Sequence, residues 1–119
     1  MEDKEVLRVI HFNDVYDIEP GDKDPIGGVA RFKTAIDRHI TDKTVVLFSG
    51  DAFSPSLLSQ KYKGEQMVLP LNSFNIDVAC LGNHDLDFEE EQSLKLQKQT
   101  NFPWVLSNFF YKGTTDRLL

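Results

Sequence analysis

The sequence predicts an α/β fold in which a mostly parallel sheet carries helices on both faces. Two observations lead to this prediction. Short apolar runs of strand length alternate along the chain with segments of helical periodicity, which is the order of elements around a parallel sheet. The first run does not alternate cleanly between apolar and polar residues, as is typical of a central strand covered on both faces. The four runs are residues 6–12, 44–48, 77–81 and 104–107.

Helical segments fill the intervals between these runs. Residues 29–40 place Val29, Phe32, Ile36 and Ile40 at helical spacing, which gives one apolar face that can pack against a sheet.

Three further segments complete the order of elements. Residues 52–60 predict a turn and a short helix with a proline near its start. Residues 64–74 predict a helix that Pro70 should kink or end early. Residues 88–100 predict an amphipathic helix, because the three glutamates near its start suit a helix N-terminus. Residues 113–119 carry no predicted structure.

Composition narrows the class of protein. With 119 residues, the chain is at most one domain with a hydrophobic core. The net charge of -6 argues against a nucleic-acid polymer as the main partner. A single cysteine excludes an internal disulfide bond. No leader-like stretch follows the charged N-terminus and no apolar run is long enough to span a bilayer. We therefore expect a cytoplasmic protein without a transmembrane segment, although a secreted protein whose leader was removed would look the same.

Polar side chains follow each of the first three apolar runs at the point where the predicted strand ends. The carboxyl ends of parallel strands meet at one edge of a sheet, and ligands bind there. We therefore expect the residues after the three runs to gather at one site. The three polar stretches are Asn13-Asp14, Ser49-Gly50-Asp51 and residues 82–87, with the sequence Gly-Asn-His-Asp-Leu-Asp.

These residue types suit the chemistry of phosphate esters. Asp14, Asp51 and Asn83 offer oxygen ligands to hard cations, and two metal ions that share a carboxylate form a clamp for phosphoryl transfer. His84 would then face the substrate, and Asp87 would hold its imidazole in one tautomer and raise its pKa. The alternative is that each Asp or Asn is a helix cap or a turn former, which is the commoner role of any one of them alone.

Five motifs carry a resemblance to a known family: residues 11–14, 27–31, 49–51, 82–85 and 107–108. In this order and spacing they resemble the calcineurin-like metallophosphoesterases, and more closely the N-terminal part of the 5′-nucleotidase and 2′,3′-cyclic-nucleotide phosphodiesterase branch. The resemblance implies that residues 1–119 are a partial metallophosphoesterase domain, the N-terminal half of an α/β sandwich. The C-terminal half of the catalytic domain and a nucleotide-recognition domain would be absent.

The same resemblance implies roles for individual residues. Asp14 would bind one divalent metal ion, Asp51 would bridge two, and Asn83 would bind the second, the ions being Mn, Zn, Mg or Fe. His84 would stabilise the transition state or protonate the leaving group, and Asp87 would pair with it. The implied activity is hydrolysis of a nucleotide or another phosphate ester.

The first motif departs from the family pattern. The family usually has an aspartate followed two residues later by a metal-binding histidine, whereas this chain has Asp14 followed by Tyr16. A phenol with an ordinary pKa of about 10 is a poor ligand near neutral pH. We expect Tyr16 to alter the metal preference or weaken occupancy of the first metal position.

A second departure concerns the number of ligands. The family draws further histidines from the second half of its sheet, but this sequence has only His11, His39 and His84. We therefore expect an incomplete metal site and little or no activity in this chain alone. The alternative function is a non-catalytic fragment or pseudoenzyme that serves as an interaction module. The unpaired edge of the last predicted strand also predicts self-association or a partner.

Overall fold

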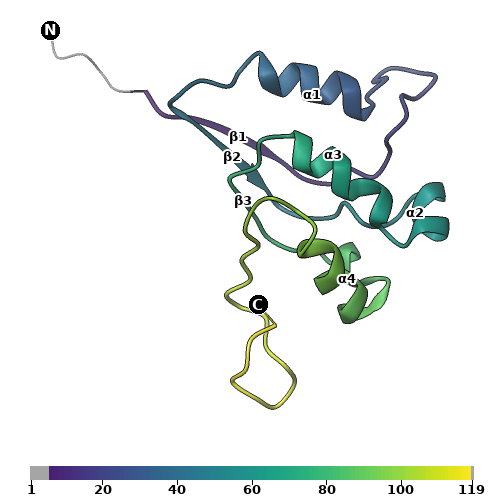
Figure 1. The fold of residues 1–119 in the computed structure, drawn as a ribbon, viewed down its shortest axis with the longest axis vertical. Coiled ribbons are helices and arrows are strands. Elements are labelled where there is room, and N and C mark those ends of the chain that lie inside the picture. Colours follow the sequence, from purple (N-terminus) through teal and green to yellow (C-terminus); the bar gives the residue numbers. More distant parts are fainter. Residues whose placement is uncertain (1–5, 119) are drawn as a thin grey trace, which may run out of the picture.

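Three parallel strands in the order β1–β2–β3 form the sheet that positions the site (Figure 1). The computed structural model describes residues 6–118. Residues 1–5, on which the expectation about a leader partly rests, and Leu119 of the C-terminal segment lie outside the described residues. The strands are β1 (Arg8–Phe12), β2 (Thr44–Phe48) and the shorter β3 (Val78–Ala79).

Helices separate the strands in the predicted order, which confirms the α/β class. Each predicted helix is present. Those predicted over residues 29–40 and 88–100 are shorter than predicted, and the short helix predicted within residues 52–60 begins later and extends to Tyr62. The helices are α1 (Val29–Asp37), α2 (Leu57–Tyr62), the 3-10 helix η1 (Glu65–Met67), α3 (Val68–Ser73), the 3-10 helix η2 (His84–Leu86) and α4 (Glu89–Gln97).

One face of the sheet carries the hydrophobic core. In the parallel register, Phe12 pairs with Phe48 and Phe48 pairs with Ala79, so these side chains share a face. All three are buried together with apolar residues of α1, η1, α3 and α4. On the opposite face, Val9 of β1 is 54% exposed. The prediction placed helices on both faces, whereas the core that the described helices share with the sheet lies on this one face.

The first strand is therefore an edge strand of the described sheet, not the central strand that its composition predicts. The prediction of a central strand rested on the apolar residues that β1 has on both faces. The sequence shows these residues, but it does not show which face is covered by other parts of the protein.

Aromatic packing fixes α1 and α3 against the sheet. The ring of Phe32 in α1 lies edge-on to Phe12, with ring centroids 4.9 Å apart, and to Phe74, with centroids 5.1 Å apart. The apolar face predicted for α1 is confirmed, because Ile36 is buried and the other three residues of that face pack against the core. These contacts hold the carboxyl end of β1 in place.

The helix predicted over residues 64–74 divides into two, but Pro70 does not break it. A 3-10 turn, η1, runs directly into α3, and Pro70 is the third residue of α3. In the first turn of a helix a backbone N–H has no partner within the helix, so proline is tolerated there.

The predicted fourth strand is reduced to one parallel bridge between Ala79 and Trp104. Ala79 donates its N–H to the carbonyl of Pro103 at 3.0 Å, and Val105 donates its N–H to the carbonyl of Ala79 at 2.8 Å. Longer pairing is prevented because β3 ends at Ala79 and Pro103 has no N–H to donate.

The C-terminal segment is more ordered than the sequence predicts. Phe110 and Arg117 form an antiparallel bridge, and Leu118 donates its N–H to the carbonyl of Phe109 at 3.2 Å. Figure 1 shows this loop, in yellow, extending away from the sheet. Among residues 6–118, every helix is too short or too polar to cross a membrane, and the compartment stays a prediction.

Candidate functional site

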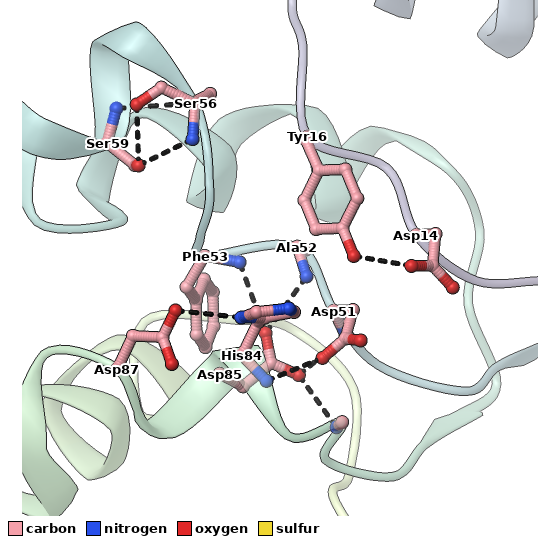
Figure 2. A network of polar contacts seen from close by, with 11 residues as sticks. Asp14, Tyr16, Asp51, Ala52, Phe53, Ser56, Ser59, His84, Asp85 and Asp87 are labelled. Atoms are coloured by element: carbon pink, nitrogen blue, oxygen red, sulfur yellow. Dashed lines mark hydrogen bonds and ion pairs between the residues drawn. The ribbon is translucent and has the colours of Figure 1, made fainter.

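The loops that follow the three strands meet at Asp51. The loop after β1 donates two backbone hydrogen bonds to the loop after β2, from Asp14 to the carbonyl of Gly50 at 3.1 Å and from Val15 to the carbonyl of Asp51 at 3.0 Å. The loop after β3 is bound to the same residue, because the backbone N–H of His84 donates to Oδ1 of Asp51 at 2.8 Å (Figure 2). The structure thus brings Asp14, Asp51 and His84 to one edge of the sheet.

Two glycines allow this approach. A Cβ atom added to Gly50 would lie 2.0 Å from the backbone nitrogen of Gly82, and one added to Gly82 would lie 2.1 Å from Oδ1 of Asp51. Gly50 also has a φ of +83°. Asp14 and Asp51 themselves have positive φ angles of 57° and 64°. Backbone strain of this kind is uncommon for a residue with a Cβ atom, and it orients the two carboxylates.

Tyr16 donates its hydroxyl hydrogen to Oδ1 of Asp14, and the side-chain amide of Asn13 donates to Oδ2. These two bonds, that from Tyr16 first, hold the pKa of Asp14 below its ordinary value, and the charge of His84 adds a smaller effect. Partial burial, and then the bond to Asp14, raise the pKa of the Tyr16 phenol, with the Asp51 charge adding to this. Tyr16 is therefore a neutral hydrogen-bond donor at neutral pH, directed at a carboxylate that is predicted to bind metal.

His84 and Asp87 form the pair that the sequence predicts. Nδ1 of His84 lies 2.9 Å from Oδ2 of Asp87, across one turn that includes η2. The hydrogen bond to Asp87 raises the pKa of His84, which burial opposes and the charges of Asp87, Asp51 and Asp14 support. The same bond lowers the pKa of Asp87, with a smaller contribution from Ser54.

Asn83 is exposed and precedes η2. It occupies the N-cap position of η2, but its side chain makes no capping hydrogen bond. Asn83 therefore does not cap η2 through its side chain, and its predicted role as a metal ligand stays a prediction.

Asp85 is the buried acid that the sequence reasoning did not single out. It is 3% exposed and accepts hydrogen bonds from the backbone of both the Asp51 loop and the Gly82 loop. The available signal was its place between His84 and Asp87 in a turn, which alone does not distinguish a buried carboxylate from an exposed one.

The donor set fits a divalent cation in kind but not in number. Two carboxylates and an amide oxygen are the ligands that hard cations prefer, and one oxygen of Asp51 already accepts the His84 N–H. Within residues 6–118, no three His, Cys, Asp or Glu side chains gather as a group that could hold a metal ion. The side chains of residues 6–118 therefore do not by themselves form a two-metal centre, and metal binding by Asp14, Asp51 and Asn83 stays a prediction.

Comparison with known proteins agrees with the fold and with the motifs. The family model described as calcineurin-like phosphoesterase matches residues 7–116. The bovine (Bos taurus) 5′-nucleotidase is 30% identical over 120 residues, which cover 90% of this chain and 21% of that relative. The chain therefore spans about a fifth of the length of the curated relatives that it matches.

Solved structures give the same result. The Haemophilus influenzae NAD nucleotidase superposes with a TM-score of 0.77 at 25% identity, covering 92% of this chain and 22% of that one. A 5′-nucleotidase precursor from Thermus thermophilus superposes with a TM-score of 0.75 at 26% identity, covering 86% of this chain and 22% of that one. By the match over residues 7–116, the chain belongs to the calcineurin-like phosphoesterase family.

Proposed function

We propose that this protein takes part in metal-dependent hydrolysis of phosphate monoesters, with nucleotides as the substrate class. One observation carries the proposal. The Asp51 carboxylate receives the His84 backbone N–H at 2.8 Å, and the His84 imidazole is held by Asp87 at 2.9 Å. A carboxylate suited to a cation thus lies beside an imidazole suited to proton transfer. Nucleotides are proposed because relatives of this chain are named 5′-nucleotidases.

Asp14, Asp51 and Asn83 are the residues proposed to hold divalent ions, with Asp51 as the shared ligand. Ions held there supply Lewis-acid polarisation of the phosphoryl group and neutralise its charge. Mn, Zn, Mg and Fe all accept such ligands. The backbone hydrogen bonds from Asp14 and Val15 to the loop after β2, and the glycine contact between Gly50 and Gly82, keep the carboxylates in place before any ligand binds.

His84 is the proposed proton donor to the leaving-group oxygen. Because Asp87 engages Nδ1, the other ring nitrogen, Nε2, is the one that meets the substrate. The raised pKa keeps His84 protonated closer to neutral pH, which suits a general acid. Asp87 fixes the tautomer and the ring orientation, so its contribution is made through His84.

Tyr16 is proposed as an altered first-metal position. Its hydroxyl donates to Asp14 in the structure, so a cation bound at Asp14 has to compete with that hydrogen bond. A neutral phenol is a weaker ligand than an imidazole, and we propose that the ion on the Asp14 side of the site is bound more weakly than the ion on the Asn83 side.

A second candidate function has an observation in its favour. Val9 and Val105 are 54% and 52% exposed, so apolar sheet residues are open to a protein partner. A non-catalytic interaction module would use such a surface and would not need the His84–Asp87 pair.

Hydrolysis by the full-length native protein separates the two functions. The substrates are p-nitrophenyl phosphate and AMP, with and without Mn²⁺, and folding is checked by circular dichroism. Asp51→Asn should lower the rate by two orders of magnitude or more, and His84→Gln by about 10²–10⁴-fold. Asp77→Asn is the control, because Asp77 accepts one backbone N–H, from Val46 at 2.8 Å, and precedes β3 at the other end of that strand. Wild-type rates in both site variants would overturn the proposal, and absence of Mn²⁺-dependent hydrolysis would favour the interaction module.

A further inference from the structure

Asp85 is a buried carboxylate to which the proposed function gives no role. Its side chain accepts backbone hydrogen bonds from four residues: Asp51 at 2.8 Å, Ala52 at 2.9 Å, Phe53 at 3.1 Å and Gly82 at 2.9 Å. Figure 2 shows Asp85 below the Asp51–Phe53 backbone, with dashed lines running to both loops. We propose that Asp85 is a positioning residue that fixes the relative placement of Asp51 and His84. This inference rests on the proposed function.

The four bonds use both oxygens of the carboxylate. Oδ1 accepts from Ala52 and Phe53, while Oδ2 accepts from Asp51 and Gly82. An ionised carboxylate is an acceptor only and can take two bonds at each oxygen. A neutral side chain of similar size cannot do this, because an amide would direct its NH₂ group at two backbone donors. The position therefore requires a carboxylate rather than a polar side chain in general.

The two hydrogen bonds that Oδ2 of Asp85 accepts tie the loop after β2 to the loop after β3. Asp51 and Gly82 donate to the same oxygen, so the backbone of the predicted metal ligand is held against the start of the turn that contains His84. The reverse contact runs from the His84 N–H to the Asp51 carboxylate at 2.8 Å. Each loop thus positions the other, and Asp85 is more deeply buried than Asp51, with 3% of its surface exposed against 9%.

Loss of the Asp85 carboxylate should lower the metal affinity of the site as well as the stability of the fold. In Asp85→Asn two of the four donors lose their acceptor: Asp51 and Gly82, or Ala52 and Phe53, according to which way the amide faces. In either orientation the Asp51–Phe53 backbone loses part of its anchor and is free to shift. Groups that orient metal ligands typically contribute about 10–100-fold to metal affinity. A purely structural role would lower the stability of the fold and leave the metal affinity of the folded molecules unchanged.

Binding of Mn²⁺ to this chain, followed by electron paramagnetic resonance, tests the inference, with urea unfolding used to correct for the folded fraction. Asp85→Asn should bind Mn²⁺ about 10–100-fold more weakly than the wild type. Asp77→Asn makes the same chemical change at the opposite end of β3 and should change the affinity less than about threefold. Wild-type affinity in folded Asp85→Asn would overturn the inference.

Amide hydrogen exchange gives a second measurement that does not depend on the variant folding. In the wild type, the amides of Asp51, Ala52, Phe53 and Gly82 should exchange slowly and as one group, together with that of His84. Rapid exchange of these amides in otherwise protected protein would also overturn the inference.

These measurements and the hydrolysis assay separate the inference from the proposed function. If the full-length protein shows no Mn²⁺-dependent hydrolysis, but these amides are protected in this chain and the His84 amide loses protection in Asp85→Asn and keeps it in Asp77→Asn, the proposed function fails and the positioning role stands. If the wild type binds Mn²⁺ and Asp85→Asn binds it equally well, the positioning role fails and the proposed function stands.

Discussion

The His84 backbone N–H donates a 2.8 Å hydrogen bond to Oδ1 of Asp51, although the two residues lie 33 positions apart in the sequence. This bond joins the loop after β2 to the loop after β3 at the carboxyl edge of the sheet. Both the candidate metal ligand and the candidate acid depend on it for their relative position.

The His84–Asp87 pair predicts a pH dependence. The hydrogen bond to Asp87 raises the pKa of His84 above 6.5 and lowers that of Asp87 below 3.8. The stability from His84 is therefore fully present below pH 6.5 and is lost as pH rises through the raised pKa. The stability from Asp87 is present above pH 3.8 and is lost as pH falls through its lowered pKa. Both side chains are more than a third exposed, at 39% and 40%, so solvent screening keeps the effect on stability small.

A nuclear magnetic resonance titration of the metal-free chain measures this directly. The His84 ring should titrate above pH 6.5, and Asp87→Asn should return its pKa toward that ordinary value. Asp77→Asn serves as the control and should leave the His84 titration as in the wild type. An unchanged His84 pKa in Asp87→Asn would contradict the structure.

Tyr16 predicts a difference in metal content. Tyr16→His replaces a neutral phenol with an imidazole, which is a common ligand for Zn, Fe and Mn, and should raise the amount of metal bound after loading with Mn²⁺ or Zn²⁺. Tyr16→Phe removes the hydroxyl that donates to Asp14 without adding a ligand. It therefore shows how much metal binding rises when the hydrogen bond to Asp14 is lost, apart from any effect of the added imidazole. The measurement is elemental analysis after desalting. Equal metal content in the wild type and Tyr16→His, with equal activity of the full-length protein, would rule out an effect of this position.

The contact between Gly50 and Gly82 predicts a large loss of stability. Gly50→Ala places a Cβ atom 2.0 Å from the Gly82 nitrogen at a φ of +83°. Overpacking and the left-handed backbone together should lower the free energy of unfolding by about 3 kcal/mol or more. Gly113→Ala is a matched control, because its φ is +79° but nothing lies within 4 Å of the added atom. Gly113→Ala should lower the free energy of unfolding only by the cost of a left-handed backbone at alanine, about 1–2 kcal/mol.

Urea unfolding curves of the two alanine variants make the comparison. Similar losses in Gly50→Ala and Gly113→Ala would mean that the two loops do not approach as closely as the structure shows.

The exposed sheet residues predict self-association. Val105 is 52% exposed next to the last bridge of the sheet, where an unpaired edge favours pairing with another molecule. Light scattering should show a mass that rises with concentration, and Val105→Lys should reduce that rise. Leu57→Lys on α2 is the control, because Leu57 is 92% exposed but lies away from the sheet edge. A monomer at all concentrations would contradict this prediction.

Much of the fold follows from the sequence because parallel strands leave long apolar runs that local patterns detect. The five-residue run at Thr44–Phe48 is predicted with both ends correct, since each of its residues pairs with β1. The run at 104–107 is not, because the pairing of Trp104 depends on the length of β3, which the residues around Trp104 do not reveal.

The candidate site also contains residues that the sequence predicts and residues that it does not. Asp14, Asp51 and His84 follow apolar runs, so the edge at which they gather can be predicted from topology alone. Asp85 cannot be found in this way, because its importance comes from four backbone donors in two loops, and backbone N–H groups are the same at every position. The hydrogen bond from Tyr16 to Asp14 likewise depends on a side-chain direction that spacing does not give.

We propose that the three strand-end loops form one site for a divalent cation, and paramagnetic broadening by Mn²⁺ in the chain's amide spectrum tests this most directly. With substoichiometric Mn²⁺, the amide signals of Asp14, Asp51, Asn83 and His84 should lose intensity first, while that of Asp77 keeps its intensity. Asp51→Asn should abolish this pattern. First loss at the acidic residues 17–24 or at the three glutamates that begin α4 would contradict the claim, as would uniform loss along the chain.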